Sequence, residues 1–119
     1  MQKLLETVQM YIDGTYRADI SLLRSAFHEK ATMSGFLGDQ LLIGSPEPFF
    51  EDMASVPSME HCGIPYKARI LSVQRTEKIA SIVLLEENFR GTAALEDHFQ
   101  LLQIDGKWKI ISKNFTTLR

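Results

Sequence analysis

The first half of the chain carries hydrophobic residues at helical spacing. The first apolar stripe recurs every three or four residues and consists of Leu4, Leu5, Val8, Tyr11 and Ile12. Glycine commonly ends a helix, but Tyr16 continues the stripe beyond Gly14, so we expect the first helix to run past it. Asp19 is a typical N-cap for a second, shorter helix. Ser45 followed by Pro46 predicts the start of a third helix.

Strand patterns begin before the third helix and fill the second half of the chain. The predicted strands, in chain order, are 31–36, 41–43, 67–74, 79–89, 93–104 and 108–115. The turn signals between them are Gly38–Asp39, Gly91 and Asp105–Gly106. Helices followed by antiparallel strands indicate the α+β class, and 119 residues are the size of one domain. We therefore expect a single α+β domain over residues 1–119.

One predicted strand is apolar on both faces. Between Ile79 and Leu85, one alternating set is Ile79, Val83 and Leu85, and the other is Ala80, Ile82 and Leu84. A sheet face in contact with water normally carries polar residues at alternate positions, so both faces of this strand need cover. Helices cover one face, and a second subunit is the simplest cover for the other. We expect a homodimer through the outer face, with Ile82 and Leu84 as outer positions; the alternative is cover by the chain's own loops.

The composition excludes several classes of partner. The chain is 45% hydrophobic and 24% charged, with a net charge of −2, as in ordinary globular domains. Its Lys and Arg residues are scattered, so we expect no nucleic-acid partner. No apolar run approaches the roughly 20 residues of a membrane helix, and Glu6 and Asp13 interrupt the N-terminal region. A soluble, cytoplasmic protein without membrane contact is expected.

Nothing in the chain predicts a metal site or a cofactor. Glu60, His61 and Cys62 are consecutive and so point in different directions, and no second group lies at ligand spacing. A Cys62–His61 nucleophile is equally weak, because catalytic pairs are assembled in space rather than as neighbours in sequence. We expect neither a metal nor a cofactor.

Four segments together resemble the nuclear-transport-factor-2-like superfamily. They are 8–12 (VQMYI), 19–23 (DISLL), 27–32 (FHEKAT) and 105–110 (DGKWKI). Within the superfamily the chain is most similar to small bacterial proteins labelled SnoaL-like or "putative lumazine-binding". The resemblance implies a cystatin-like cone, with three N-terminal helices packed on a strongly curved mixed or antiparallel sheet. It also implies a pocket for small, often cyclic and apolar molecules, and dimers formed through the outer face of the sheet.

One predicted strand face combines a carboxyl group with apolar residues. Asp97 shares its face with Leu95, Phe99 and Leu101, because side chains alternate along a strand. A carboxyl group buried there either pairs with a cation or has its pKa raised. Ketosteroid isomerases, which belong to the same superfamily, hold a substrate oxygen with a protonated Asp and a Tyr. The resemblance places Asp97 and Tyr11 at those two positions.

These residues also have ordinary structural interpretations. Asp97 would be neutralised by pairing with Arg69 or Arg90 across the sheet, and Tyr11 would be a core aromatic with a satisfied hydroxyl. The general base of the isomerases corresponds to Gly35, which cannot accept a proton, so their mechanism is not expected here. Gly35→Asp is the change expected to install weak activity if the cavity fits the substrate.

The sequence leaves three functions open. The candidate pocket residues are Tyr11, Tyr16, Phe50, Asp97, Phe99 and Trp108, the last also interpreted as a core anchor. The first function is a homodimeric domain that binds a small organic molecule. The second is an isomerase, cyclase or dehydratase acting on a cyclic substrate, which a base from Asp39 or from loop 56–65 would favour. The third is a non-catalytic dimeric interaction protein, which the absence of a cavity would favour.

Overall fold

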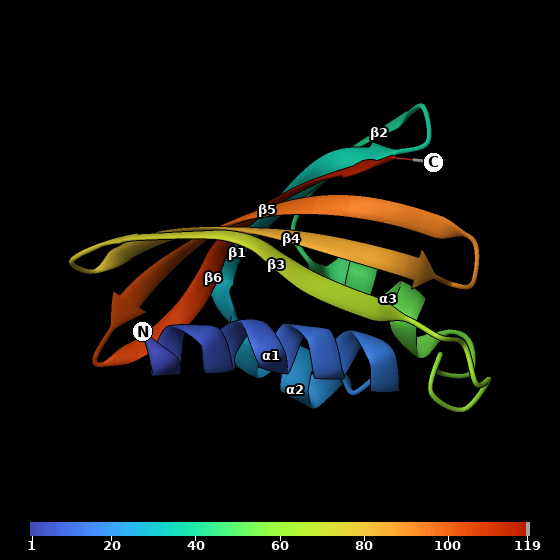
Figure 1. Ribbon diagram of the computed structural model, residues 1–119, viewed down its shortest axis with the longest axis horizontal. Helices are drawn as coiled ribbons and strands as arrows, with labels where there is room; N and C mark the ends of the chain where they lie inside the picture. Colours follow the sequence, from blue (N-terminus) through green and yellow to red (C-terminus); the bar gives the residue numbers. More distant parts are fainter. Residues whose placement is uncertain (119) are drawn as a thin grey trace.

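The computed structural model describes residues 1–118 and has the predicted order of elements (Figure 1). The helices are α1 (Gln2–Arg17), α2 (Ile20–Ala26) and α3 (Glu47–Ala54). The strands are β1 (Phe27–Leu37), β2 (Gln40–Gly44), β3 (Lys67–Thr76), β4 (Ile79–Phe89), β5 (Ala93–Ile104) and β6 (Lys107–Thr117). The α+β class is confirmed. The main difference from the prediction is β1, which begins directly at the end of α2 rather than four residues later.

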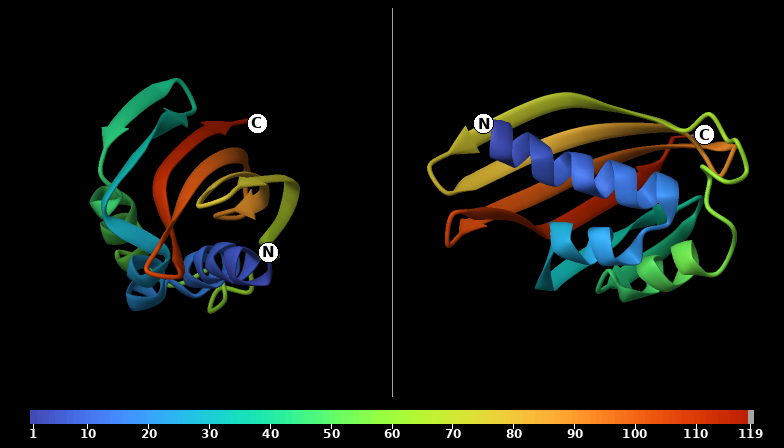
Figure 2. Two further views of the ribbon diagram at one scale, coloured as in Figure 1. Left: turned by 90° about the vertical axis from the view of Figure 1, so that its left-hand side faces the viewer. Right: turned by 90° about the horizontal axis from the view of Figure 1, so that it is seen from below.

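The six strands form one curled sheet in the order β2-β1-β6-β5-β4-β3. β1 and β6 run parallel, and every other neighbouring pair is antiparallel. The sheet curves around the helices without closing into a barrel (Figure 2). Helices α1 and α2 lie beneath its inner face, and α3 lies beneath the side formed by β1 and β2 (Figures 1 and 2). The helices therefore cover one face of the sheet, and no described helix lies on the other.

Local sequence features explain how the helices meet the sheet. Gly14 does not end α1; a Cβ atom there would lie 2.8 Å from the Leu23 side chain, so glycine lets α2 pack closely. Ala18 takes the left-handed conformation that ends α1. The Asp19 side chain then accepts the backbone N–H of Leu22 at 3.1 Å, which confirms the predicted N-cap of α2.

The apolar core lies between α1, α2 and the inner face of the sheet. Its fully buried members include Leu4, Val8, Leu23, Ile82, Leu84 and Ile110. The expectation that Ile82 and Leu84 face outward is wrong, because both have no exposed surface and belong to this core. Both alternating sets of β4 are apolar, so hydrophobicity alone could not tell which set faces the helices.

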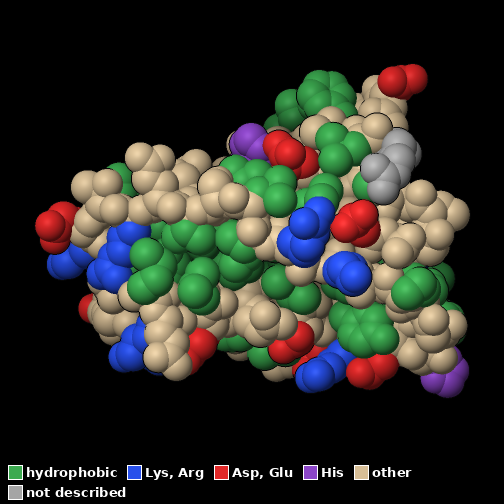
Figure 3. Space-filling model, in the orientation of Figure 1, with side chains coloured by type: hydrophobic (Ala, Val, Ile, Leu, Met, Phe, Trp, Pro, Cys, Tyr) green, Lys and Arg blue, Asp and Glu red, His purple; other side chains and the backbone are tan. Residues whose placement is uncertain are grey.

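The outer face and the rim of the sheet expose other apolar residues. Val83 and Leu85 of β4 are half-buried, while Ile79 is 56% exposed. The β1–β2 hairpin adds a group of exposed apolar side chains: Phe36, Leu37, Leu41, Leu42 and Ile43. Figure 3 shows hydrophobic side chains gathered over this hairpin. Among the described residues, no helix has the length and apolar character needed to cross a membrane.

Candidate functional site

A cavity opens between α3, the β1–β2 hairpin and the inner face of β4, β5 and β6. Its volume is about 360 Å³, within the usual range of pockets for small organic ligands. Most of its wall is apolar and includes Met33, Leu42, Phe49, Phe89, Leu95 and Phe115. Three charged side chains, Glu86, Asp97 and Lys113, form what we call the floor of the cavity.

The register of three neighbouring strands brings the floor residues together. On β5, Asp97 lies opposite Leu84 of β4 and Phe115 of β6. Glu86 is two residues beyond Leu84, and Lys113 is two residues before Phe115, so both share the face of Asp97 as its diagonal neighbours. None of the three side chains is more than 4% exposed. The floor is therefore a buried charged cluster rather than a solvated surface.

Two tyrosines hold Glu86 in place. Tyr11 of α1 donates a hydrogen bond to Glu86 Oε2 at 3.2 Å, and Tyr66, just before β3, donates one to Glu86 Oε1. Burial raises the pKa of both tyrosines well above the ordinary value, and the charge of Glu86 raises it further. Both hydroxyls therefore stay protonated and remain donors. Tyr16 stacks on Tyr66, with ring centroids 6.0 Å apart.

Lys113 is enclosed by aromatic rings. Its Nζ lies 4.7 Å from the centre of the Phe49 ring, 4.8 Å from that of Tyr11 and 5.3 Å from that of Phe115. The ammonium donates a hydrogen bond to Tyr11 Oη at 2.6 Å. Aromatic faces and a buried carboxylate partly replace the water that an ammonium normally holds.

Asp97 is the least satisfied member of the floor. It has no exposed surface, and neither carboxyl oxygen has a hydrogen-bond partner among the described residues. Lys113 Nζ lies 3.9 Å from Oδ1, which is within ion-pair range but too long for a hydrogen bond. Burial raises the pKa of Asp97 well above its ordinary value of 3.8, Glu86 raises it further, and Lys113 offsets part of the rise. Asp97 therefore tends to keep a proton.

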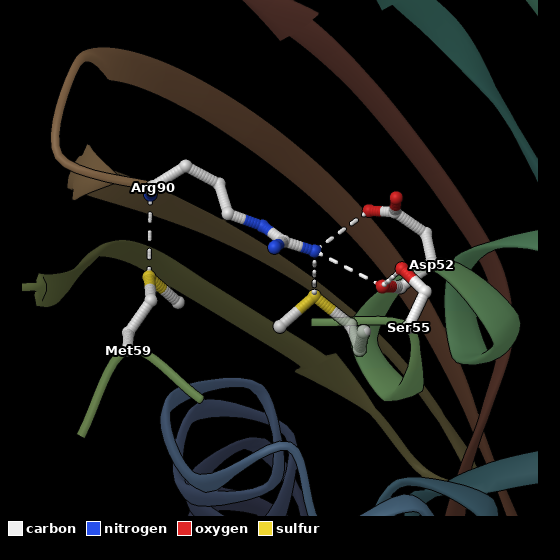
Figure 4. A network of polar contacts seen from close by, with 5 residues as sticks. Asp52, Ser55, Met59 and Arg90 are labelled. Atoms are coloured by element: carbon white, nitrogen blue, oxygen red, sulfur yellow. Dashed lines mark hydrogen bonds and ion pairs between the residues drawn. The ribbon is translucent and has the colours of Figure 1, made fainter. Parts of the chain in front are cut away.

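An ion pair ties α3 to the β4–β5 turn at the rim of the cavity. Arg90 donates to the carboxylate of Asp52 at 2.9 Å and to the Asp52 backbone carbonyl at 3.2 Å (Figure 4). Its backbone N–H also points to Met59 Sδ at 3.2 Å. Asp52 lines the cavity, so this pair fixes α3 against the turn beside the opening.

Comparisons with known proteins identify the family. The family model described as "Putative lumazine-binding" matches residues 1–116. The chain belongs to this family. No curated protein matches the chain.

Solved structures agree with the family assignment. An NTF2-like protein of unknown function from Shewanella baltica OS155 is 28% identical, with a TM-score of 0.87 over 99% of this chain and 93% of that one. A ketosteroid isomerase-like protein from Erwinia carotovora atroseptica is 19% identical, with a TM-score of 0.69 over 98% of this chain and 94% of that one. A cystatin-like protein of unknown function from Nostoc punctiforme is 14% identical, with a TM-score of 0.67, covering 98% and 89%. The last two show the shared fold.

In this family member, the backbone itself keeps a side chain away from position 35. A Cβ atom on Gly35 would lie 2.0 Å from the carbonyl oxygen of its β6 partner, Phe115. This clash argues against the expectation that Gly35→Asp installs weak activity. An aspartate there requires β1 and β6 to separate, so it does not restore a general base inside an intact sheet.

The structure separates the predicted pocket residues into two groups. Asp97 lines the cavity, and Tyr11 lies directly behind the floor, hydrogen-bonded to Glu86 and Lys113. The other four predicted residues do not line this cavity: Tyr16, Phe50, Phe99 and Trp108. The Phe99 ring packs edge-on against Tyr11, with ring centroids 4.9 Å apart. Phe50 belongs to the core beside Phe27, and Trp108 is 3% exposed in the core.

The predicted ion pair of Asp97 with Arg69 or Arg90 does not form. Arg69 pairs with Glu87 instead, and Arg90 pairs with Asp52.

Sequence reasoning missed Glu86, Lys113 and Tyr66. Glu86 shares the parity of Ile82 and Leu84, so β4 carried a usable signal once its inner set was known. Lys113 had no such signal. The pairing register of β6 with β5 shifts by one residue between Ile110 and Ser112. Simple alternation from Ile110 would turn Ser112 inward, and the shift turns Lys113 inward in its place. Tyr66 precedes β3 and has no periodic context.

Proposed function

We propose that this domain binds one small, mostly apolar organic molecule of one or two rings in the cavity above the charged floor. The observation that carries this proposal is Asp97, a fully buried carboxyl group on the cavity wall without a hydrogen-bond partner among the described residues. Buried polar groups are nearly always satisfied in native proteins, so an exception needs an explanation, and a functional role is one. A ligand with a polar group at its inner end would satisfy Asp97, while its rings would contact the apolar wall.

The family description supports the same class of ligand. It names lumazine, a heterocycle of two fused rings that a cavity of about 360 Å³ is large enough to hold. The ketosteroid isomerase-like neighbour is described by its likeness to enzymes that act on fused-ring molecules. Neither comparison identifies the ligand of this chain.

The proposal includes a homodimer formed through the outer face of the sheet. All three helices lie on the inner face, and the half-buried pair Val83 and Leu85 lies on the outer one. Sedimentation equilibrium should give about twice the chain mass of 13.5 kDa. Val83→Glu should shift the protein towards monomer, because it places a carboxylate in the interface, whereas Ser81→Thr should not. A monomeric wild-type protein would contradict this part of the proposal.

An enzymatic function is the second candidate. The expected bases do not supply it, since Asp39 is exposed and neither it nor loop 56–65 lines the cavity. Glu86 is the carboxyl group that favours it, because it lies on the floor beside Asp97. Both Glu86 oxygens accept tyrosine hydroxyls, however, which suits a supporting role better than proton abstraction. We therefore propose binding as the primary function.

A blocking substitution tests the binding proposal. Leu42 lines the cavity, and Leu41, its neighbour on the same exposed hairpin strand, does not. We expect Leu42→Trp to abolish binding of naphthalene, 2-naphthol and lumazine in calorimetric titrations, whereas Leu41→Trp leaves it unchanged. If the wild-type protein binds none of these probes, or if the two variants behave alike, the cavity is not the ligand site.

A further inference from the structure

The floor of the cavity has both an acceptor and a donor without full hydrogen bonding. Asp97 has two carboxyl oxygens without a partner, and the Lys113 ammonium, which has three N–H bonds, donates to Tyr11 alone among the described residues. The two groups lie side by side, with Nζ 3.9 Å from Oδ1. Both residues line the same cavity, so one ligand could engage both groups.

Asp97 remains an acceptor even when it carries a proton. Burial, and then the charge of Glu86, raises the pKa of Asp97, so its protonated form is favoured. Glu86 itself is held by Tyr11 and Tyr66. A protonated carboxyl group still has a carbonyl oxygen that accepts, and Asp97 Oδ1 lies 3.9 Å from the Lys113 ammonium. The floor then presents one acceptor and one donor next to each other.

From this pairing we infer that Asp97 and Lys113 recognise the edge of a cyclic amide or imide, where a ring N–H stands next to a ring C=O. The N–H donates to Asp97, and the C=O accepts from Lys113. The rest of the ligand is a flat ring system, which suits the aromatic rings of Phe49 and Phe115 in the cavity wall. This inference rests on the proposed function, because it assigns the polar end of the ligand that the cavity holds.

The charges of the floor disfavour a ligand whose polar end is a carboxylate or an ammonium group. A carboxylate ligand would add a second negative charge beside Glu86, and an ammonium ligand would lie next to Lys113. Each brings like charges together in a buried site, where they are screened poorly. A neutral amide edge satisfies both groups and adds no charge.

Binding requires a small movement of the floor. The Asp97 oxygens have almost no accessible surface. Lys113 is 4% exposed, and its ammonium group is carried by a flexible side chain. A ligand reaches Asp97 when the Lys113 ammonium turns towards the incoming carbonyl oxygen. The ammonium then exchanges its contact with Tyr11 for one with the ligand or shares the two.

Two isomers of dimethyllumazine test this inference on the wild-type protein. In 6,7-dimethyllumazine both ring N–H groups of the imide side are free, whereas in 1,3-dimethyllumazine methyl groups replace them. The two compounds have the same formula and ring system. Calorimetric or fluorescence titration should show the 1,3-isomer binding about tenfold to hundredfold more weakly, because it leaves the buried Asp97 acceptor unpaired.

Two substitutions assign the preference to the named residues. Asp97→Leu should abolish the difference between the isomers and retain binding of the 1,3-isomer. Lys113→Met should weaken both isomers about equally, because both keep their carbonyl groups. His98→Asn, on the exposed outer face of β5, is the matched control and should keep the full preference.

The outcomes separate this inference from the proposed function. Equal affinity of the two isomers for the wild-type protein, or binding of naphthalene without either isomer, overturns the amide-edge inference and leaves the cavity as a ligand site. If none of the three probes binds, the proposed function fails and the inference fails with it. A preference for the 6,7-isomer that survives Asp97→Leu also overturns the assignment to Asp97.

Discussion

The two ends of the interior differ in chemistry, although strands β4, β5 and β6 contribute to both. At the end near the N-terminus, Leu4, Val8, Trp108 and Ile110 fill the space between α1 and the sheet with apolar side chains. At the other end, the same strands surround a cavity and bury Glu86, Asp97 and Lys113. We call these the filled end and the open end.

The difference indicates what each end contributes. Burial of apolar surface is the dominant stabilising term in folding, and the filled end supplies it without buried charges. A buried charged cluster is often no more stabilising than apolar residues of similar volume. The open end, with an unpartnered carboxyl group and an unfilled cavity, therefore does little for stability. Its chemistry is better explained by ligand recognition than by folding.

The largest expected effect lies at the filled end. Trp108→Ala should lower the free energy of unfolding by about 3–5 kcal/mol, because it removes a buried aromatic side chain and leaves a void. Leu42→Ala at the open end, where the side chain is 37% exposed, should lower it by about 1 kcal/mol or less. Urea denaturation of both variants measures the contrast. Equal losses would show that the two ends do not differ in this way.

Gly35→Ala tests the close contact between β1 and β6 beside the open end. A methyl group there meets the Phe115 carbonyl oxygen, so the strands must separate, with an expected loss of about 1–3 kcal/mol. Gly44→Ala on β2 is the matched control, because a Cβ atom there meets nothing within 4 Å. Thermal unfolding of the pair measures the difference. If both variants unfold at the wild-type temperature, the strands are less tightly joined at Gly35 than the structure indicates.

Asp97→Asn should stabilise the protein near neutral pH. The folded-state pKa of Asp97 is raised, so its stabilising contribution is present below the ordinary value of 3.8 and is lost as pH rises through the folded-state pKa. The amide carries no charge and avoids that loss. We therefore expect a measurable gain in the free energy of unfolding at neutral pH. Chemical denaturation at acidic and neutral pH should show the gain at neutral pH only.

Asp52→Asn should have the smallest effect on stability. Asp52 and Arg90 form an ion pair with side chains 64% and 29% exposed, and such pairs contribute about 0.2–1 kcal/mol. The loss should shrink in high salt, because salt screens exposed charges. A loss comparable to that of Trp108→Ala would place the rim of the cavity among the main stabilising contacts.

The sequence predicted the filled end well and only part of the open end. Apolar periodicity is a strong signal, so the stripe through Leu4 and Val8 identified the buried face of α1. Strand parity likewise turned Asp97 inward. Glu86 was missed because a charged residue near a strand end is usually solvated, and Lys113 because the register shift in β6 reverses its side. Hydrogen bonds between distant segments, such as Tyr66 to Glu86, leave no pattern in the sequence.

The pKa of Asp97 tests most directly the claim that the open end holds an uncompensated buried acid. An NMR titration of its carboxyl carbon in the wild-type protein measures it, with Asp97→Asn to assign the signal. The account predicts a midpoint well above 3.8, because burial and the charge of Glu86 outweigh the attraction of Lys113. A midpoint at or below 3.8 would mean that Lys113 compensates Asp97 fully, and the case for a ligand group at this position would fail.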